Sequence, residues 1–156
     1  KNAPYDKFWQ GAKSAMSVSA VNGMNLFFGK AKCAICHNGP AFTDNQFHNI
    51  GVKQYGPLKK DLGRYNVTKE NFDKGAFKTP TLRDVSKHAP YMHDGSIATL
   101  REVIEHYNKG GNLNPYLSKK IKPLNLDEDE ITALVKFMEA LDGEGYQDVM
   151  PSFFPQ

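Results

Sequence analysis

The feature that most constrains this chain is the motif Cys33-Ala34-Ile35-Cys36-His37, which contains the only two cysteines of the 156-residue sequence. C-x-x-C-H is the attachment signature of a c-type haem. Two thiols at this spacing add to the two vinyl groups of one porphyrin, and the histidine that follows becomes the proximal ligand of the iron. We therefore expect one covalently bound haem, with thioether bonds at Cys33 and Cys36 and with His37 on the iron.

Other uses of a C-x-x-C pair agree less well with the sequence. A thioredoxin-type redox pair belongs in a βαβ context, and this sequence shows no alternation of strand and helix patterns. A structural zinc site needs four ligands, typically with a second cysteine or histidine pair, and the chain has no second cysteine pair. The other histidines are scattered: His48, His88, His93 and His106. A disulfide across so short a loop would leave His37 without a role.

Size and composition agree with a haem-binding domain. The length suits one domain, and aromatic residues make up 12% of the chain, which suits the burial of a flat apolar macrocycle. The formal charge of +3 is small and argues for neither nucleic acid nor a membrane surface as partner. No stretch of the sequence is apolar for long enough to form a transmembrane helix.

The sequence begins with Lys1-Asn2-Ala3-Pro4 and shows no apolar signal region. Covalent attachment of haem in bacteria takes place outside the cytoplasm. We therefore expect a periplasmic protein from which a signal peptide has been removed, or a piece of a longer precursor.

Three amphipathic helices are predicted from the apolar spacing. The first runs from about Ser17 to Phe28 and can close at Gly29. The second begins near Thr99, in a sequence that fits a capping box, and ends at residues 110–111. Their apolar faces are Ala20, Met24, Phe27 and Phe28 in the first helix, and Leu100, Val103, Ile104 and Tyr107 in the second.

The third helix is predicted to start at Asp127 and to stop at Gly143. Its buried face consists of Ile131, Leu134, Val135, Met138 and Leu141. Residues 38–81 contain turn signals and no strand-like alternation, so we expect irregular loops there, as when loops wrap a cofactor. The tail, residues 150–156, is expected to lie on a surface.

The second axial ligand decides between electron transfer and catalysis. A methionine raises the reduction potential and closes the iron to small molecules, whereas an open position permits peroxide or oxygen chemistry. Met92 is the best candidate, because residues 89–95 flank it with proline and glycine as in a loop that presents a ligand. The other methionines suit core or tail positions: Met16, Met24, Met138 and Met150.

A histidine in the second axial position stays open as an alternative. His48 lies within reach of the proximal side, and we expect it to be a hydrogen-bonded histidine rather than a ligand. His93 adjoins Met92 and is expected to orient the loop through Asp94. The remaining two, His88 and His106, are expected at the surface.

Residues 29–40, residues 47–52 and residues 75–85, the last running on from Ala89 to Leu100, resemble the C-terminal haem domain of bacterial di-haem cytochrome c peroxidases and their MauG-like relatives. The resemblance extends from about Pro4 to about Gly143. It implies an all-α, class I cytochrome c-like fold, with few helices and long irregular loops around one haem. We accordingly treat residues 1–156 as a single cytochrome c-like domain, with an N-terminal extension at 1–12 and a C-terminal tail at 144–156.

The resemblance also implies functional roles. In that family the C-terminal haem is the high-potential electron-transfer centre, commonly with His/Met ligation, and Met92 matches the methionine. MauG-like relatives can use a tyrosine in that position, and Tyr91 adjoins Met92. A calcium ion commonly sits between the two haem domains, held partly by backbone carbonyls, and we assign no residues to it.

Two functions follow as expectations. The first is single-electron transfer with a redox protein, a small cytochrome or copper protein, or with a second haem domain. The second is a haem peroxidase, or a fragment or subunit of one, for which His93, Glu102 or Arg83 would be the acid/base residue. The chain has one C-x-x-C-H rather than two, so the peroxidatic domain of the family has no counterpart in it. Lys30 and Lys32, beside the motif, are expected to be ordinary solvated charges.

Overall fold

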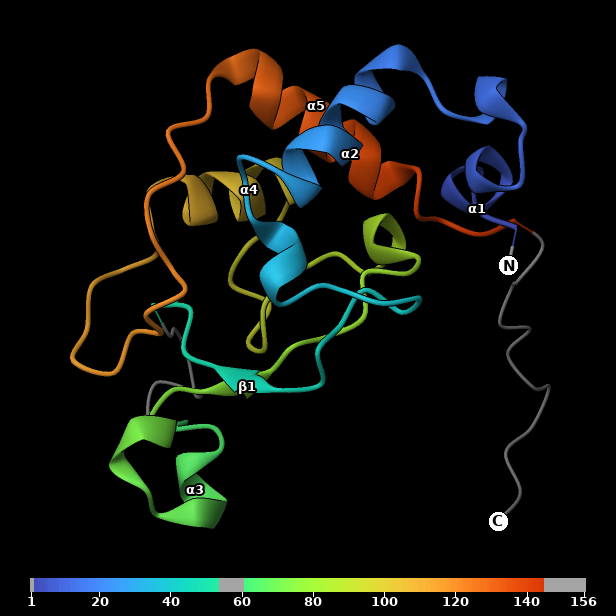
Figure 1. Cartoon of the computed structure of the whole chain (residues 1–156). Coiled ribbons are helices and arrows are strands. Elements are labelled where there is room, and N and C mark those ends of the chain that lie inside the picture. The colour runs from blue at the N-terminus through green and yellow to red at the C-terminus, as the bar shows by residue number, and fades with distance from the viewer. Residues whose placement is uncertain (1, 54–60, 145–156) are drawn as a thin grey trace, which may run out of the picture.

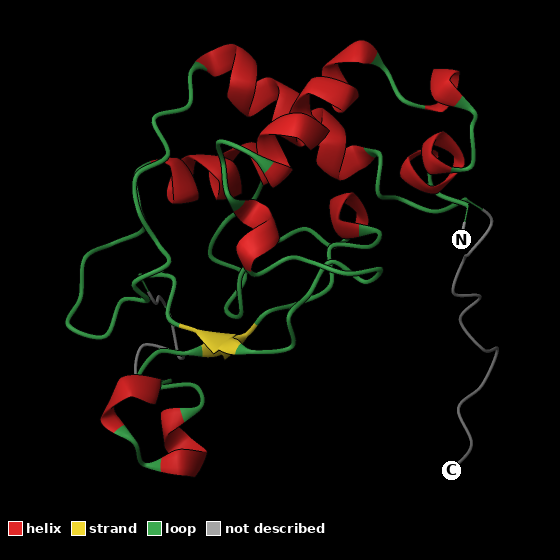
Figure 2. Ribbon diagram, viewed as in Figure 1, coloured by secondary structure: helices red, strands yellow, loops and turns green. Residues whose placement is uncertain are grey.

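Three helices form the centre of the fold in the computed structural model, which describes residues 2–53 and 61–144. They are α2 (Val18–Phe28), α4 (Leu100–Asn108) and α5 (Glu128–Glu139). Helix α2 packs against α5, and α4 also packs against α5 (Figures 1 and 2). No helix of the described residues has the length and apolar character needed to span a membrane.

Each of these helices begins with a side-chain cap, and the caps of α4 and α5 are the capping boxes that the sequence predicts. The Ser17 hydroxyl accepts a hydrogen bond from the Ala20 N–H at 3.1 Å, and α2 ends at Gly29. Capping boxes open α4, at Thr99 and Glu102, and α5, at Asp127. The three predicted helices are confirmed.

Two details of the helix predictions are wrong. Helix α5 ends at the C-cap Ala140, three residues before Gly143, because residues 141–143 turn back toward the segment that contains Asp84. Phe28 is 50% exposed, whereas its neighbour Phe27 is fully buried. Phe28 lies at the edge of the apolar face of α2, where its ring is 6.4 Å from that of Phe137 in α5 and remains half exposed.

The core is centred on aromatic rings. The largest fully buried side chains are Phe27, Phe42, Phe137, Leu134 and Leu141. The rings of Phe27 and Phe137 lie 5.1 Å apart, and those of Phe27 and Phe42 lie 5.8 Å apart. Both ring pairs are edge-to-face contacts, the arrangement that aromatic quadrupoles favour. This cluster joins α2 and α5 to the loop that follows the C-x-x-C-H motif.

Residues 2–12 lie against this core rather than extending away from it. They contain a helix that the apolar spacing did not predict, α1 (Pro4–Trp9). The Tyr5 N–H donates to the Ala140 carbonyl at 3.0 Å, and the Tyr5 ring lies 5.2 Å from that of Phe42. Asp6 accepts two hydrogen bonds from Arg83, each of 3.0 Å. In Figure 1, α1 lies beside the end of α5.

Between the motif and α4, the described chain is mainly loop. Two short strands, β1 (Phe47–His48) and β2 (Phe77–Lys78), pair antiparallel. A one-turn helix, α3 (Tyr65–Thr68), lies beyond them in a small lobe (Figure 1). Short 3₁₀ turns occur at Lys13–Ala15, Cys33–Ile35, Asn71–Asp73 and Val85–Lys87. The expected all-α fold, with few helices and long loops, is confirmed, and strands of two residues are too short to show alternation.

One histidine does not lie where the sequence suggested. His106 was expected at the surface, and it is only 6% exposed, with its Nε2–H donating to the Ile50 carbonyl at 2.9 Å. It sits where the last turn of α4 meets the loop after β1, a tertiary contact that helical spacing does not predict. His88 is exposed, as expected. The predicted surface position of residues 150–156 lies outside the described residues.

Close packing of α2 on α5 depends on Gly23. A Cβ atom at this position would lie 1.9 Å from the carbonyl oxygen of Ala133 and 2.9 Å from the Cβ of Phe137. Gly23→Ala must push the two helices apart, so we expect it to lower the free energy of unfolding by about 3 kcal/mol. Thermal unfolding followed by circular dichroism measures this loss. The exposed Asn22→Ala on the same helix is the control, expected within about 0.5 kcal/mol of wild type. Equal stability of the two variants would contradict this packing.

Candidate functional site

The C-x-x-C-H motif forms one tight turn directly after α2. Lys32 adopts a left-handed conformation, with φ of 53°, and starts the 3₁₀ turn Cys33–Ile35. The N–H of Cys36 and that of His37 both donate to the Cys33 carbonyl, at 3.2 and 2.9 Å. The three chemically active side chains are thereby held within a single turn, and Cys33 packs against the hydrophobic core.

Both cysteines are free thiols in this structure. Burial raises the pKa of the Cys33 thiol to about 12. Burial also raises the pKa of the Cys36 thiol, although the nearby Lys120 ammonium acts to lower it. A thioredoxin-type pair needs a thiol with a depressed pKa and a βαβ setting, and neither occurs in the part of the chain that the structure describes. The described geometry therefore disfavours a dithiol redox site.

The hydrogen bonding of His37 favours Nε2 as the ring nitrogen that would bind a metal. Its Nδ1 lies 3.0 Å from the Phe42 carbonyl oxygen, which can only accept, so in the neutral ring Nδ1 carries the proton and the lone pair is on Nε2. Burial lowers the pKa of the imidazole, which favours the neutral form that a metal requires. A backbone carbonyl that orients a ligating histidine in this way is a recurrent feature of metal sites.

Phe42 fixes the position of that carbonyl. Its side chain is fully buried in the aromatic core, and its backbone has a positive φ of 53°. A non-glycine residue costs roughly 1–2 kcal/mol in this region, a strain that the packing of the ring must offset. Two free thiols at the vinyl spacing and one oriented, neutral imidazole form the donor set that a c-type haem needs. The residues present therefore fit this group.

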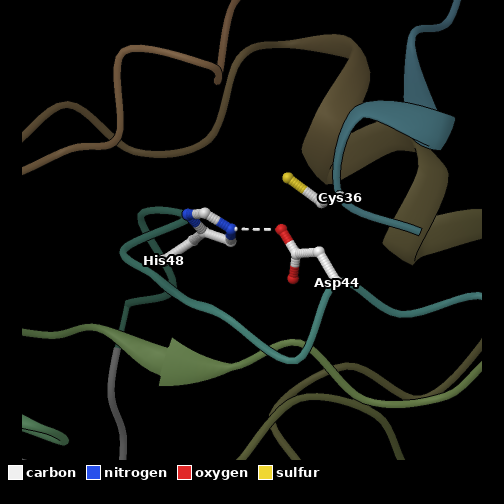
Figure 3. A group of neighbouring side chains, drawn as sticks. All are labelled: Cys36, Asp44 and His48. Carbon is white, nitrogen blue, oxygen red and sulfur yellow. Dashed lines mark hydrogen bonds and ion pairs between the residues drawn. The ribbon is translucent and has the colours of Figure 1, made fainter. Parts of the chain in front are cut away.

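A polar cluster borders the motif on one side. Asp44 and His48 point toward each other, with 2.8 Å between the carboxylate Oδ2 and the ring Nε2, and the Cys36 sulfur lies on the same side of Asp44 (Figure 3). The Lys120 ammonium lies 3.7 Å from Asp44 and 3.9 Å from the Cys36 sulfur. His48 is thus a hydrogen-bonded histidine, as expected.

This cluster does not form a convincing zinc site. Cys36, Asp44 and His48 are the only group of three potential ligand atoms within 4.8 Å of one another among the described residues. A structural zinc ion takes four ligands, and Cys33 is not part of the group. Cys36 is better explained as the second cysteine of the C-x-x-C-H motif. Asp44 and His48 already hydrogen-bond to each other.

The loop that carries Met92 is closed by backbone hydrogen bonds. The N–H of Tyr91 donates to the Ile97 carbonyl at 2.7 Å, and that of Ile97 donates in return at 3.4 Å. Met92 has a φ of 73°, an uncommon conformation for a residue with a side chain. Such outliers concentrate at ligand clamps. The Tyr91 hydroxyl donates to the Ser86 carbonyl at 3.4 Å.

The other methionines that the structure describes have packing roles. They lie buried in the hydrophobic core: Met16, Met24 and Met138. A place on an apolar helix face was expected for Met24 and Met138, and Met16 was expected just before a helix. Among the described methionines this leaves Met92 as the one in a loop. Met150 lies outside the described residues.

Contacts connect the Met92 loop to the motif. The ring of His93 stacks on Phe77, with centroids 3.6 Å apart and an interplanar angle of 14°. Phe77 pairs with His48 in the two-stranded ribbon, and His48 bonds to Asp44. The N–H of Asp44 donates to the Cys36 carbonyl at 2.7 Å. This series of contacts ties the loop that contains Met92 to the turn that contains the cysteines.

The candidate acid/base residues of a peroxidase have structural partners. Arg83 forms a two-pronged ion pair with Asp6. Glu102 completes the capping box at the start of α4. Lys30, expected to be a solvated charge, pairs with Glu130 at the surface. The structure thus gives Arg83 and Glu102 roles in stability.

The Asp44 carboxyl makes stability depend on pH. Burial alone would raise its pKa, but hydrogen bonds from His48, the Gln46 N–H and Thr79 lower it from 3.8 to about 2. Because the folded pKa is depressed, the stabilisation is present above the unfolded value and is lost as the pH falls through about 2. We expect a contribution of about 1–2 kcal/mol, allowing for solvent screening.

Asp44→Asn should remove most of this acid dependence. The measurement is the free energy of unfolding by denaturant at steps between about pH 5 and pH 2, where a lowered carboxyl pKa acts. The exposed Asp129→Asn serves as the matched control and should keep the wild-type slope. Identical slopes in all three proteins would show that the Asp44–His48 pair does not contribute as described.

Comparison with known proteins gives a consistent set of matches. The model of the Cytochrome c family matches residues 20–142. The cytochrome-c peroxidase IdrP1 of Denitromonas iodatirespirans is 40% identical over 88% of this chain and 44% of its own length. The methylamine utilization protein MauG of Methylorubrum extorquens is 42% identical over 96% of this chain and 42% of its own length. The chain thus spans less than half the length of these relatives.

Solved structures agree with these matches. A MauG-like protein associated with microbial copper homeostasis superposes with a TM-score of 0.80 at 30% identity, over 92% of this chain and 52% of that one. The di-haem peroxidase BthA of Burkholderia thailandensis superposes with a TM-score of 0.74 at 18% identity, over 97% and 48%, which speaks to the fold alone. The resemblance inferred from the sequence is confirmed.

Proposed function

The chain belongs to the cytochrome c family, and from this membership we propose that it binds one haem c and uses it to transfer single electrons. Cys33 and Cys36 would hold the haem through thioether bonds, and His37 would bind the iron through Nε2. Met92 would occupy the opposite axial position. When bound, the haem supplies a one-electron couple between ferric and ferrous iron.

The observation that carries this proposal is the hydrogen bond from His37 Nδ1–H to the Phe42 carbonyl. It fixes the tautomer and the ring orientation of the proposed proximal ligand, and it increases the basicity of Nε2. The carbonyl belongs to Phe42, whose side chain is part of the aromatic core. A methionine on the other face would stabilise the ferrous state and keep small molecules from the iron.

Membership of the family supports a proposal for location and partners. We place the protein in the bacterial periplasm, where covalent haem attachment is completed. Its electron partner would be a small cytochrome, a copper protein or a second haem domain. The family resemblance also implies a calcium ion, to which we assign no residues.

A peroxidase role is the alternative, and the names of the relatives favour it. The two functions differ in how the reduced protein reacts with hydrogen peroxide. We expect each chain to take up one electron when the protein is reduced. When the reduced protein is then mixed with hydrogen peroxide in a stopped-flow instrument, we expect its iron to be oxidised slowly. Fast oxidation at low peroxide concentration would favour an open iron and the peroxidase function.

A further inference from the structure

Trp9, the only tryptophan of the chain, is 62% exposed at the end of α1. Large aromatic side chains are usually buried, and tryptophan is enriched at contact surfaces because it has an apolar body and a polar N–H. The indole is not isolated from the interior. Its ring lies 6.3 Å from that of Tyr5, at an interplanar angle of 69°.

The ring contacts continue inward to the proposed haem ligand. Tyr5 lies 5.2 Å from the ring of Phe42 at an angle of 72°. The carbonyl of the same Phe42 accepts the hydrogen bond from His37 Nδ1–H at 3.0 Å. A short series of contacts, Trp9 to Tyr5 to Phe42 to His37, thus leads from the surface to the imidazole.

Neighbouring groups hold these rings in place. The Arg83 guanidinium lies 5.6 Å from the Tyr5 ring and 5.1 Å from the Phe42 ring, and two hydrogen bonds to Asp6 fix it there. The backbone N–H of Tyr5 donates a hydrogen bond to the Ala140 carbonyl. Burial raises the pKa of the Tyr5 phenol, against opposing effects of Trp9 and Arg83, so the phenol keeps its proton near neutral pH.

We propose that Trp9 is the point at which an electron enters the chain, and that Tyr5 and Phe42 couple this point to His37. The inference rests on the proposed function. A reduced one-electron donor, a haem or copper protein, loses one electron, and ferric iron bound at His37 gains it. No bond forms or breaks and no proton moves, because the rings serve only as the medium through which the electron tunnels.

The test uses the haem-loaded protein with a light-driven donor attached beside Trp9. The Lys13 ammonium lies 5.8 Å from the Trp9 ring and 4.2 Å from the Phe8 ring, so Lys13→Cys labelled with a ruthenium tris-bipyridine complex places the donor beside both rings, and Phe8→Leu in the labelled protein should leave the rate unchanged. A laser flash starts the transfer, and the absorbance change of the iron gives its rate. Trp9→Leu in the labelled protein should slow the transfer several-fold, and Trp9→Phe should recover most of the rate.

Phe28→Leu is the matched control. Phe28 is also an exposed aromatic residue, and its ring lies 5.3 Å from Phe27 in the same core, but it lies on α2 rather than α1. Its loss should leave the rate from position 13 unchanged. The reduction potential and the oxidised spectrum should be the same in every variant, because Trp9 touches neither the cysteines nor His37.

The possible outcomes distinguish a failure of the proposed electron route through Trp9 from a failure of the proposed electron-transfer function. Equal rates for the labelled wild type and Trp9→Leu would overturn the route and leave single-electron transfer intact. A changed potential or spectrum in Trp9→Leu would also overturn it, since the residue would then act by shaping the haem site. If the iron accepts no electron from this label or from one at Lys69→Cys in the α3 lobe, the proposed function itself is wrong.

Discussion

Simultaneous replacement of Cys33 and Cys36 by alanine is expected to abolish covalent haem attachment. Each thioether needs a cysteine sulfur, and the chain has no other cysteine that could substitute. The haem would then be held by axial ligation alone. Intact mass spectrometry after denaturation should show the haem adduct on the wild type and its complete absence on the double variant.

The same variant should also lose stability, because a covalently held macrocycle is part of what the surrounding loops fold around. Ile35→Val is the matched control, since Ile35 lies between the two cysteines and is 48% exposed. It should keep the full haem mass and a stability within about 0.5 kcal/mol of wild type. A haem adduct that survives in the double variant would rule out the assignment of the thioethers.

Met92→Ala has the second large effect. Loss of the thioether sulfur should open one face of the iron, remove the weak red absorption band of methionine–iron ligation, and lower the reduction potential. We expect a fall on the order of 0.1 V, a part of the roughly 0.8 V range over which axial ligands set haem potentials. A redox titration followed by absorbance measures both changes in one experiment.

Two control variants make this result specific. Met138→Leu replaces a buried methionine of similar volume and should keep the red band, at a cost below about 1.5 kcal/mol in stability. Tyr91→Phe removes the hydroxyl that bonds to Ser86 and should leave the band and the potential unchanged. If Tyr91→Phe alters the iron spectrum and Met92→Ala does not, tyrosine is the axial ligand.

Much of the fold could be predicted from local sequence signals. Helices α2, α4 and α5 are encoded by cap residues and apolar spacing within the same ten or twelve positions, so Ser17, Thr99 and Asp127 identified their starts. The C-x-x-C-H motif is likewise local. These features need no knowledge of what the rest of the chain does.

The features that were missed depend on contacts between distant segments. Helix α1 is six residues long and is held by Ala140, Phe42 and Arg83, none of which is near it in sequence. His106 is buried because a loop some fifty residues earlier supplies Ile50 as its acceptor. The spacing of apolar residues within one helix carries no information about either of these contacts.

Parts of the candidate site were also unpredictable for this reason. The role of Phe42 lies in its backbone carbonyl, and a side-chain pattern carries no signal for that. Asp44 and His48 stand four residues apart, a spacing that offered a weak hint of their hydrogen bond. Lys120 reaches Asp44 from a segment beyond α4, and no sequence signal marks it.

The central claim is a haem closed by His37 and Met92, and the absorption spectrum of the oxidised wild-type protein tests it most directly. The account predicts a low-spin ferric spectrum with the weak red band of methionine–iron ligation. A high-spin ferric spectrum without that band would contradict it, since the iron would then have an open face.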